Sequence, residues 1–171
     1  MRPSDLLLEL YGRVPPIVAD AVVDLGAEQL SWVPDPEANS IGWLVWHLTR
    51  VQDHHVSELL GARQLWVDGP WAEGCGLAAD PHNTGYAHTG EERQAVQPEG
   101  PDVLVDYLAQ VGARTSAFVE GLIESDLDRV VDRRWDPPVT LGVRLVSIGD
   151  DSLQHAGQAA YVRGLLDRWR A

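Results

Sequence analysis

Apolar residues recur at three- and four-residue intervals in four stretches of the chain, the spacing typical of amphipathic helices that bury one face. The first stretch covers about residues 4–25 and the second about residues 39–60. The third runs from residue 101 to about 122, and the fourth from about 140 to 170. These helices predict an all-α, four-helix bundle that forms one domain over residues 1–171.

Local signals help to set the ends of these helices. Pro15 and Pro16 lie inside the first stretch and should kink or divide it, because proline cannot donate the main-chain hydrogen bond. Asn39 or Ser40 is a suitable N-terminal cap for the second helix, and Gly61 suits its C-terminal end. The expected boundaries therefore depend on capping residues as well as on periodicity.

The segment from about residue 64 to residue 100 has no helical period and is rich in glycine and proline. We expect a long irregular loop between the second and third helices, a kind of connection that often serves as a lid or a binding loop. We interpret His82 and His88 as exposed residues of this loop, and Cys75 as an unreactive thiol. Farther along, residues 129–132 predict a short extended piece.

Composition and charge narrow the class of protein. Hydrophobic residues make up 44% of the chain and charged residues 23%, as in a soluble globular protein. The N-terminal sequence lacks the pattern of a signal peptide, and no apolar run reaches the roughly 20 residues that span a bilayer. We therefore expect a cytoplasmic protein with no membrane partner. The formal net charge of −13 repels phosphate backbones, so no nucleic-acid partner is expected.

The fourth helix carries polar residues where its buried face should be apolar. Its inward stripe follows alternating steps of four and three residues. The stripe consists of Leu141, Leu145, Ile148, Ser152, His155, Ala159, Val162, Leu166 and Trp169. Asp151 precedes His155 by one helical turn, so both side chains project from the same region of the helix. A carboxylate and an imidazole in this spacing can share one metal ion.

The second helix offers a third ligand. His47 lies among tryptophan and aliphatic residues, where an unpaired imidazole would be costly. His54 lies on nearly the same face but about 10 Å farther along the axis, so one ion cannot easily bind both. His55, on the apolar stripe, is a lesser candidate. The set of His47, Asp151 and His155 would leave coordination positions open, as in a catalytic metal site.

Other interpretations of these residues stay open. A buried histidine can be satisfied by a main-chain carbonyl or a neighbouring acid, and an Asp–His pair one turn apart can be a local ion pair. A one-residue change of helix phase would make Asp150, rather than Asp151, the inward acid. We interpret Trp43 and Trp46 as core or interface residues.

Two segments, NSIGWLVWHLTRVQDHHVSELLG and DDSLQHAGQAAYVRGLL, together resemble the DinB-like superfamily. Within it, the chain is similar to the branch that includes the N-terminal domain of mycothiol-dependent maleylpyruvate isomerase and related mycothiol transferases. The resemblance implies a bundle with up-down-down-up topology and a divalent metal, commonly zinc or nickel. The family's ligands are one histidine of the second helix and two residues four apart on the last helix. They map to His47, Asp151 and His155.

The same resemblance implies a function. The family uses a low-molecular-weight thiol as co-substrate, so we expect a metal-dependent S-transferase that joins mycothiol to a small electrophile, with a role in detoxification. We expect no catalytic residue beyond the metal ligands. Arg50, for an anionic group, and Gln158 are candidate substrate-binding residues; the alternative for Arg50 is a solvated surface charge. Bundles of this family often pair through helix faces, so a homodimer is expected.

Two further functions are considered beside the transferase. A water in the open coordination position would make the same site a metal-dependent hydrolase of a small molecule or a thiol conjugate. Alternatively, the polar cluster could supply core hydrogen bonds in a non-catalytic bundle that binds a small molecule or a partner. The isomerase has a second domain that contributes to its active site, so we do not expect maleylpyruvate isomerisation itself.

Overall fold

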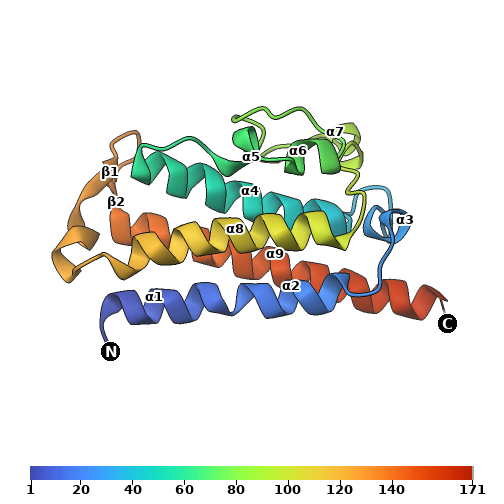
Figure 1. Ribbon diagram of the computed structural model, residues 1–171, viewed down its shortest axis with the longest axis horizontal. Helices are drawn as coiled ribbons and strands as arrows, with labels where there is room; N and C mark the ends of the chain where they lie inside the picture. Colours follow the sequence, from blue (N-terminus) through green and yellow to red (C-terminus); the bar gives the residue numbers. More distant parts are fainter. Residues whose placement is uncertain (171) are drawn as a thin grey trace.

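The long helices pack into a bundle whose topology matches the prediction. The structure, a computed structural model, describes residues 1–170. The bundle helices are α1 (Pro3–Gly12), α2 (Val14–Val22), α4 (Ile41–Leu60), α8 (Pro101–Glu120) and α9 (Leu141–Arg170). In Figure 1, α1, α2 and α9 run in one direction, and α4 and α8 run in the opposite direction. This is the up-down-down-up arrangement of an all-α bundle.

The capping signals of the sequence are confirmed. Pro15 and Pro16 occupy the first turn of α2, where a missing N–H leaves no hydrogen bond unmade, and the break falls at Arg13 just before them. The Ser40 hydroxyl accepts a hydrogen bond from the main-chain N–H of Trp43 and caps α4. Gly61 ends α4 in the left-handed region, with φ 62°.

The connections contain more regular structure than the sequence predicted. The segment of residues 64–100 includes the short helices α5 (Leu65–Asp68), α6 (Trp71–Gly74) and α7 (Gly90–Gln94), and α3 (Ala27–Leu30) precedes α4. The expectation of an irregular loop was therefore wrong in part, because helices of one turn are too short to produce a period. The helix η1 (Glu124–Asp128) leads into β1 (Val130–Asp132), the predicted extended piece, which pairs antiparallel with β2 (Val139–Thr140).

The buried apolar residues form two clusters along the bundle. The larger cluster includes Trp46 of α4 and Ala159 of α9, and the smaller includes Val56 of α4 and Leu145 of α9. Between the clusters, α4 and α9 bury polar side chains instead, and the candidate site lies there. Among the described residues, no helix is both long enough and apolar enough to cross a membrane.

The inward stripe of α9 is confirmed except at its last position. Leu141 through Leu166 are buried on it, apart from the half-buried His155. Trp169 is 71% exposed, and its assignment to the buried stripe was wrong. The physical reason is length: α9 has 30 residues and α4 has 20, so the end of α9 extends past its neighbours, as Figure 1 shows. Only Trp32 stacks near the exposed ring, at 5.9 Å between centroids, among the aromatic pairs described.

Candidate metal centre

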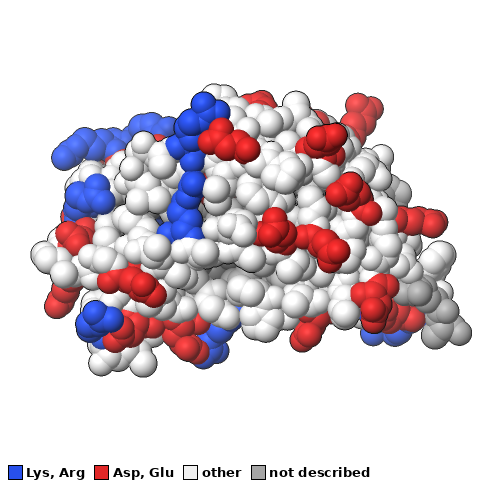
Figure 2. All heavy atoms as spheres, in the orientation of Figure 1, with Lys and Arg blue, Asp and Glu red and all other residues white. Residues whose placement is uncertain are grey.

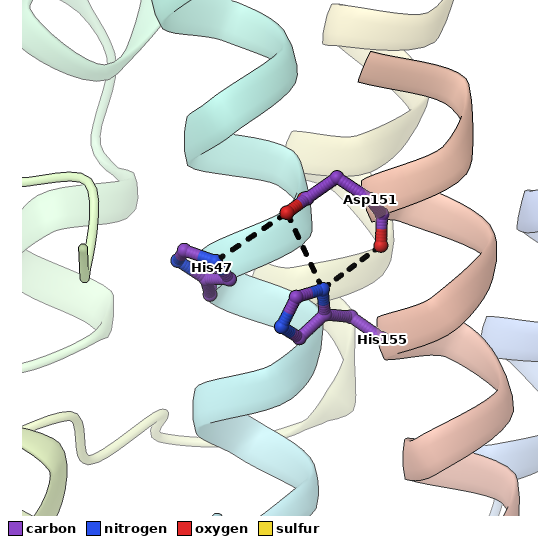
Figure 3. Close-up of side chains that lie close together, drawn as sticks. All are labelled: His47, Asp151 and His155. Carbon is purple, nitrogen blue, oxygen red and sulfur yellow. Dashed lines mark hydrogen bonds and ion pairs between the residues drawn. The ribbon is translucent and has the colours of Figure 1, made fainter. Parts of the chain in front are cut away.

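The three predicted ligands meet where α4 and α9 pack against each other. His47 comes from α4, and Asp151 and His155 come from successive turns of α9 (Figure 3). Asp151 Oδ1 lies 3.9 Å from His47 Nε2 and 3.6 Å from His155 Nδ1. One potential ligand atom from each residue lies within 4.8 Å of the others, so the three side chains are close enough to share one ion.

His47 has its metal-binding nitrogen free and its other nitrogen engaged. Its Nδ1–H donates a hydrogen bond to the main-chain carbonyl of Thr84, which leaves the Nε2 lone pair directed at Asp151. Burial lowers the pKa of His47 to about 4, although the bond to Thr84 opposes the shift. The imidazole is therefore neutral at pH 7, which is the form that binds a metal.

His155 is arranged in the same way. Its Nδ1–H donates a 2.8 Å hydrogen bond to the main-chain carbonyl oxygen of Asp151, one turn earlier on α9. With Nδ1 engaged, Nε2 is the nitrogen left for a ligand, and the ring projects toward α4 in Figure 3. A main-chain carbonyl thus satisfies each histidine, as one alternative supposed, but only at one of its two nitrogens.

The Asp151 carboxylate lacks a donor. Both neighbouring imidazoles donate to main-chain carbonyls, and within the described part of the chain no group donates to the buried Oδ2 atom. Burial raises the pKa of Asp151, and the nearby Asp150 raises it further, whereas His155 opposes the shift. The Nε2 atom of His47 and the Asp151 carboxylate are therefore acceptors 3.9 Å apart with no donor between them, and a bound cation would satisfy both. The residues fit a divalent metal.

The helix phase selects Asp151 over Asp150. Asp150 is exposed and accepts a 2.7 Å hydrogen bond from the side-chain amide of Gln154 on the outer surface of α9. Gln158 is exposed as well, one turn beyond His155, and the structure shows no contact that bears on its proposed role in substrate binding.

The loop that covers His47 depends on a glycine. Gly85 has φ +91°, and a Cβ atom added there would lie 2.6 Å from His47 Nδ1 and 2.9 Å from the Trp46 ring. Trp43 stacks on the His47 ring, with ring centroids 4.6 Å apart and an interplanar angle of 11°. Trp43 and Trp46 are both buried, as interpreted from the sequence, and the stacking of Trp43 restricts the plane of the imidazole.

His88 belongs to this support and is not an exposed loop residue. Trp43 Nε1–H donates to His88 Nδ1 at 3.2 Å, so the proton of the neutral ring is on Nε2, which donates to Asn83 Oδ1 at 2.8 Å. The ring also stacks on Trp46 with centroids 5.6 Å apart. The sequence interpretation was wrong here because the partners of His88 come from a distant helix. His82 is exposed, as expected.

Arg50 lies in the core. Its side chain is fully buried, so the alternative of a solvated surface charge was wrong. Its guanidinium donates to the Asn83 and Pro81 carbonyls, to Gln64 Oε1 and to the Tyr107 hydroxyl, at 2.9–3.2 Å. These contacts fix the loop one residue before Thr84. Arg50 thereby supports the position of His47 indirectly, and its predicted contact with an anionic substrate has no structural support.

Asp53 anchors the start of the same segment. It is fully buried and accepts hydrogen bonds from the main-chain N–H groups of Leu65 and Trp66 and from the Tyr107 hydroxyl. Sequence reasoning missed Asp53, and its place one helical turn after Arg50 was the available signal. A charged pair one turn apart on a helix with a buried face indicates an internal network.

A second group of potential ligands on α4 is less suited to a metal. His54, His55 and Glu58 also lie within 4.8 Å of one another. However, the Gln64 amide donates to His54 Nδ1, which places the proton of the neutral ring on Nε2. The Arg144 guanidinium lies 3.4 Å from both ring nitrogens of His55 and would repel a cation. The structure therefore favours the His47 group.

A cavity of about 760 Å³ extends from His47 and Asp151 along the groove between α4 and α9. Residues of the loop from Asp80 to Tyr86 form its cover. Cys75 lies elsewhere in the core, where burial raises the pKa of its thiol to about 12, in keeping with an unreactive cysteine. The cavity therefore gives a small molecule direct access to His47 and Asp151.

Comparison with known proteins connects this geometry to a family. Residues 16–168 match the family described as mycothiol-S-transferase, which covers most of the chain. A solved structure described as the crystal structure of the conserved protein of locus from Enterococcus faecalis is 33% identical in sequence. It superimposes with a TM-score of 0.89 and covers 97% of this chain and 98% of that one. No curated protein matches the chain.

Proposed function

The chain belongs to the mycothiol-S-transferase family, and from this premise we propose that it is a divalent-metal-dependent enzyme that transfers mycothiol to a small electrophilic molecule. The observation that carries the metal requirement is that His47, Asp151 and His155 place potential ligand atoms within 4.8 Å of one another, while the buried Oδ2 atom of Asp151 lacks a donor. Two imidazoles and one carboxylate suit zinc or nickel.

The metal would supply one piece of chemistry: in an open coordination position it lowers the pKa of a thiol, which is near 8.5 in water, so that the sulfur is a thiolate at neutral pH. His47 and His155 would contribute neutral nitrogens, and Asp151 a negative charge, so the protein offsets only part of the metal's charge. The Thr84 carbonyl keeps the Nε2 atom of His47 free of its proton.

The transfer itself balances without a further reactant. The thiol loses its proton to solvent, the sulfur forms a bond to the electrophilic carbon, and the bond from that carbon to its leaving group breaks. The leaving group departs with the electron pair. The cavity beside Asp151 is large enough for a small molecule and is covered by the loop that carries Thr84 and Gly85. The predicted homodimer and cytoplasmic location stay predictions.

Metal analysis of protein purified without a histidine tag tests the metal site. We expect about one equivalent of metal in the wild type and little in His155→Ala. The matched control is His82→Ala, which removes an exposed histidine that lines the same cavity. Equal metal content in His155→Ala and the wild type would reject the site.

The reaction is tested with 1-chloro-2,4-dinitrobenzene as the electrophile, in the presence and absence of mycothiol and before and after treatment with a chelator. Chloride release that requires both the thiol and the metal supports the transferase. Chloride release that needs the metal but not mycothiol would identify a hydrolase instead. No turnover by a protein that binds metal fully would leave the non-catalytic alternative.

A further inference from the structure

The cavity beside the metal centre has two polar ends separated by an apolar middle. Because α4 and α9 run antiparallel, they contribute pairs of lining residues in successive layers. From one end to the other, these pairs are His47 with Asp151, Val51 with Ile148, and His55 with Arg144. The metal group occupies the first layer. The function proposed above leaves the third layer unexplained.

Arg144 brings a positive charge to the far end. Its side chain is 15% exposed, and its Nη2 atom forms a 3.0 Å ion pair with Asp132. Asp132 is shared, because Arg134 also binds it through two side-chain hydrogen bonds of 2.8 and 3.0 Å. The Nη1 atom of Arg144 faces His55, which is neutral because burial, and then Arg144 itself, lower its pKa to about 4. The single negative charge of Asp132 thus balances only part of the positive charge of Arg134 and Arg144.

His54 adds a hydrogen-bond donor to the same end. Gln64 Nε2 donates to the Pro81 carbonyl and to His54 Nδ1, while Gln64 Oε1 accepts from Arg50, so the amide orientation is fixed. The proton of the neutral His54 ring is then on Nε2. Since His54 lines the cavity, this end offers an N–H group and a guanidinium together.

Apart from Asp151 in the metal group, the acidic residues at or near the cavity have other partners or are screened by solvent. Asp80 accepts the main-chain N–H of His82, and Glu92 accepts the N–H of Thr89 in a helix cap. Glu58 lies 3.7 Å from His55 Nδ1 but is 59% exposed, so solvent screens it. Asp80, Glu92 and Glu58 therefore do not pair with Arg144, which is the cation that faces the cavity from α9.

Arginine residues gather near this end, although the chain carries a net charge of −13. Figure 2 shows arginine side chains gathered at the end of the molecule where β1 and β2 lie in Figure 1. The segment of residues 129–134 contributes Arg129, Arg133 and Arg134. Acidic residues of the same region, Glu124, Asp126, Asp128 and Asp136, balance these charges, so attraction of an anion into the cavity depends on Arg144 itself.

We propose that Arg144, with His54, binds a carboxylate of the electrophilic substrate. The substrate class is then a small carboxylic acid whose reactive carbon lies at the metal end and whose short apolar chain lies against Val51 and Ile148. Arg144 and Asp151 are seven residues apart on α9, which is about 10 Å along the helix axis. This inference rests on the proposed transferase function.

The test compares 6-bromohexanoate with its methyl ester as electrophiles for the metal-loaded protein at saturating mycothiol. We expect kcat/KM for the acid to exceed that for the ester by about tenfold or more, because a charge-assisted hydrogen bond to Arg144 is lost with the ester. Arg144→Gln should remove the preference, mainly through KM for the acid, and leave the ester unchanged. Arg144→Lys should restore part of it.

Arg134→Gln is the matched control, because Arg134 also forms an ion pair with Asp132 but does not line the cavity. It should keep the preference for the acid. An acid-to-ester ratio that is unchanged in Arg144→Gln, or that falls equally in Arg134→Gln, would overturn the proposal.

A binding measurement separates this proposal from the transferase function. It uses the wild-type protein, so it does not require that any variant folds. Hexanoate added to the wild-type protein should shift the ring NMR signals of His54 and His55, and neutral hexanamide should not. If mycothiol displaces bromide from neither substrate but hexanoate binds in this way, the carboxylate site stands and the transferase is rejected for these substrates. If transfer proceeds without preference and hexanoate does not bind, the carboxylate site is rejected and the transferase stands.

Discussion

His47 on α4 donates its Nδ1–H to the main-chain carbonyl of Thr84, a residue of the loop that covers the cavity. The bond couples two features that are separate in the sequence, a helix residue and an irregular segment 37 residues later. It fixes which nitrogen of His47 is free for a metal. The conformation of the loop therefore helps to set the orientation of His47 in the site.

Gly85→Ala should weaken metal binding without touching a ligand. The added Cβ would collide with His47 and Trp46, and the left-handed backbone disfavours alanine, so the Thr84 carbonyl must move. We expect metal affinity to fall by about 10- to 100-fold, measured by titration against a competing chelator.

The control for Gly85→Ala is Gly76→Ala, at a glycine with φ +70° whose added Cβ would meet only ordinary contacts with Gln97. It should cost about 1 kcal/mol of stability and leave metal affinity unchanged. Equal metal affinity in both variants would show that the loop does not position His47.

Asp151→Asn should abolish metal binding yet leave the metal-free protein at least as stable as the wild type. The reason is that the Asp151 carboxylate is partly buried with no donor to its Oδ2 atom, so the uncharged amide relieves a cost of folding. Thermal denaturation with and without added zinc measures both effects: zinc should raise the Tm of the wild type and not that of the variant.

Asp150→Asn provides the comparison for Asp151→Asn, because Asp150 lies on the exposed side of the same helix turn. Its Tm should rise with zinc as in the wild type. A loss of the zinc response in Asp150→Asn but not in Asp151→Asn would mean that the helix phase described here is wrong.

Asp53→Asn should destabilise the fold by roughly 3 kcal/mol, because the amide group would face donors that now bind a buried carboxylate. Urea denaturation monitored by tryptophan fluorescence gives the free energy of unfolding. Tyr107→Phe removes one of these donors and should cost less, about 1–2 kcal/mol. A smaller loss in Asp53→Asn than in Tyr107→Phe would contradict the central place of Asp53 in this network.

The metal-free protein should lose stability as the pH falls from 6.5 to about 4, and His55 should account for part of the loss. Burial and the neighbouring Arg144 and His54 lower the pKa of His55 to about 4, against 6.5 ordinarily, while Glu58 opposes the shift. In this window the unfolded chain binds a proton that the folded chain does not, so acid favours unfolding. The contribution is roughly 2–3 kcal/mol.

Urea denaturation of the wild type and His55→Gln at pH 7, 5.5 and 4.5, with a chelator present throughout, tests this prediction. The decrease in the free energy of unfolding between pH 7 and 4.5 should be smaller in the variant. A variant that loses as much stability as the wild type would exclude His55 as a source of the pH dependence.

The sequence by itself determined the helices and part of the site. Periodicity located the bundle helices, and Asp151 with His155 could be placed on one face of α9, because residues four apart are neighbours in any α-helix. Ser40, Gly61 and the Pro15–Pro16 pair determined helix ends through local hydrogen bonding and backbone geometry, which require no distant partner.

Only the tertiary structure decided how these elements meet. The antiparallel register of α4 against α9 places His47 beside Asp151 and His55 beside Arg144, and no spacing within either helix specifies that register. The loop contacts of His47, His88 and Arg50 also join residues far apart in the chain. Such contacts depend on packing between whole elements, which a local pattern of residues does not encode.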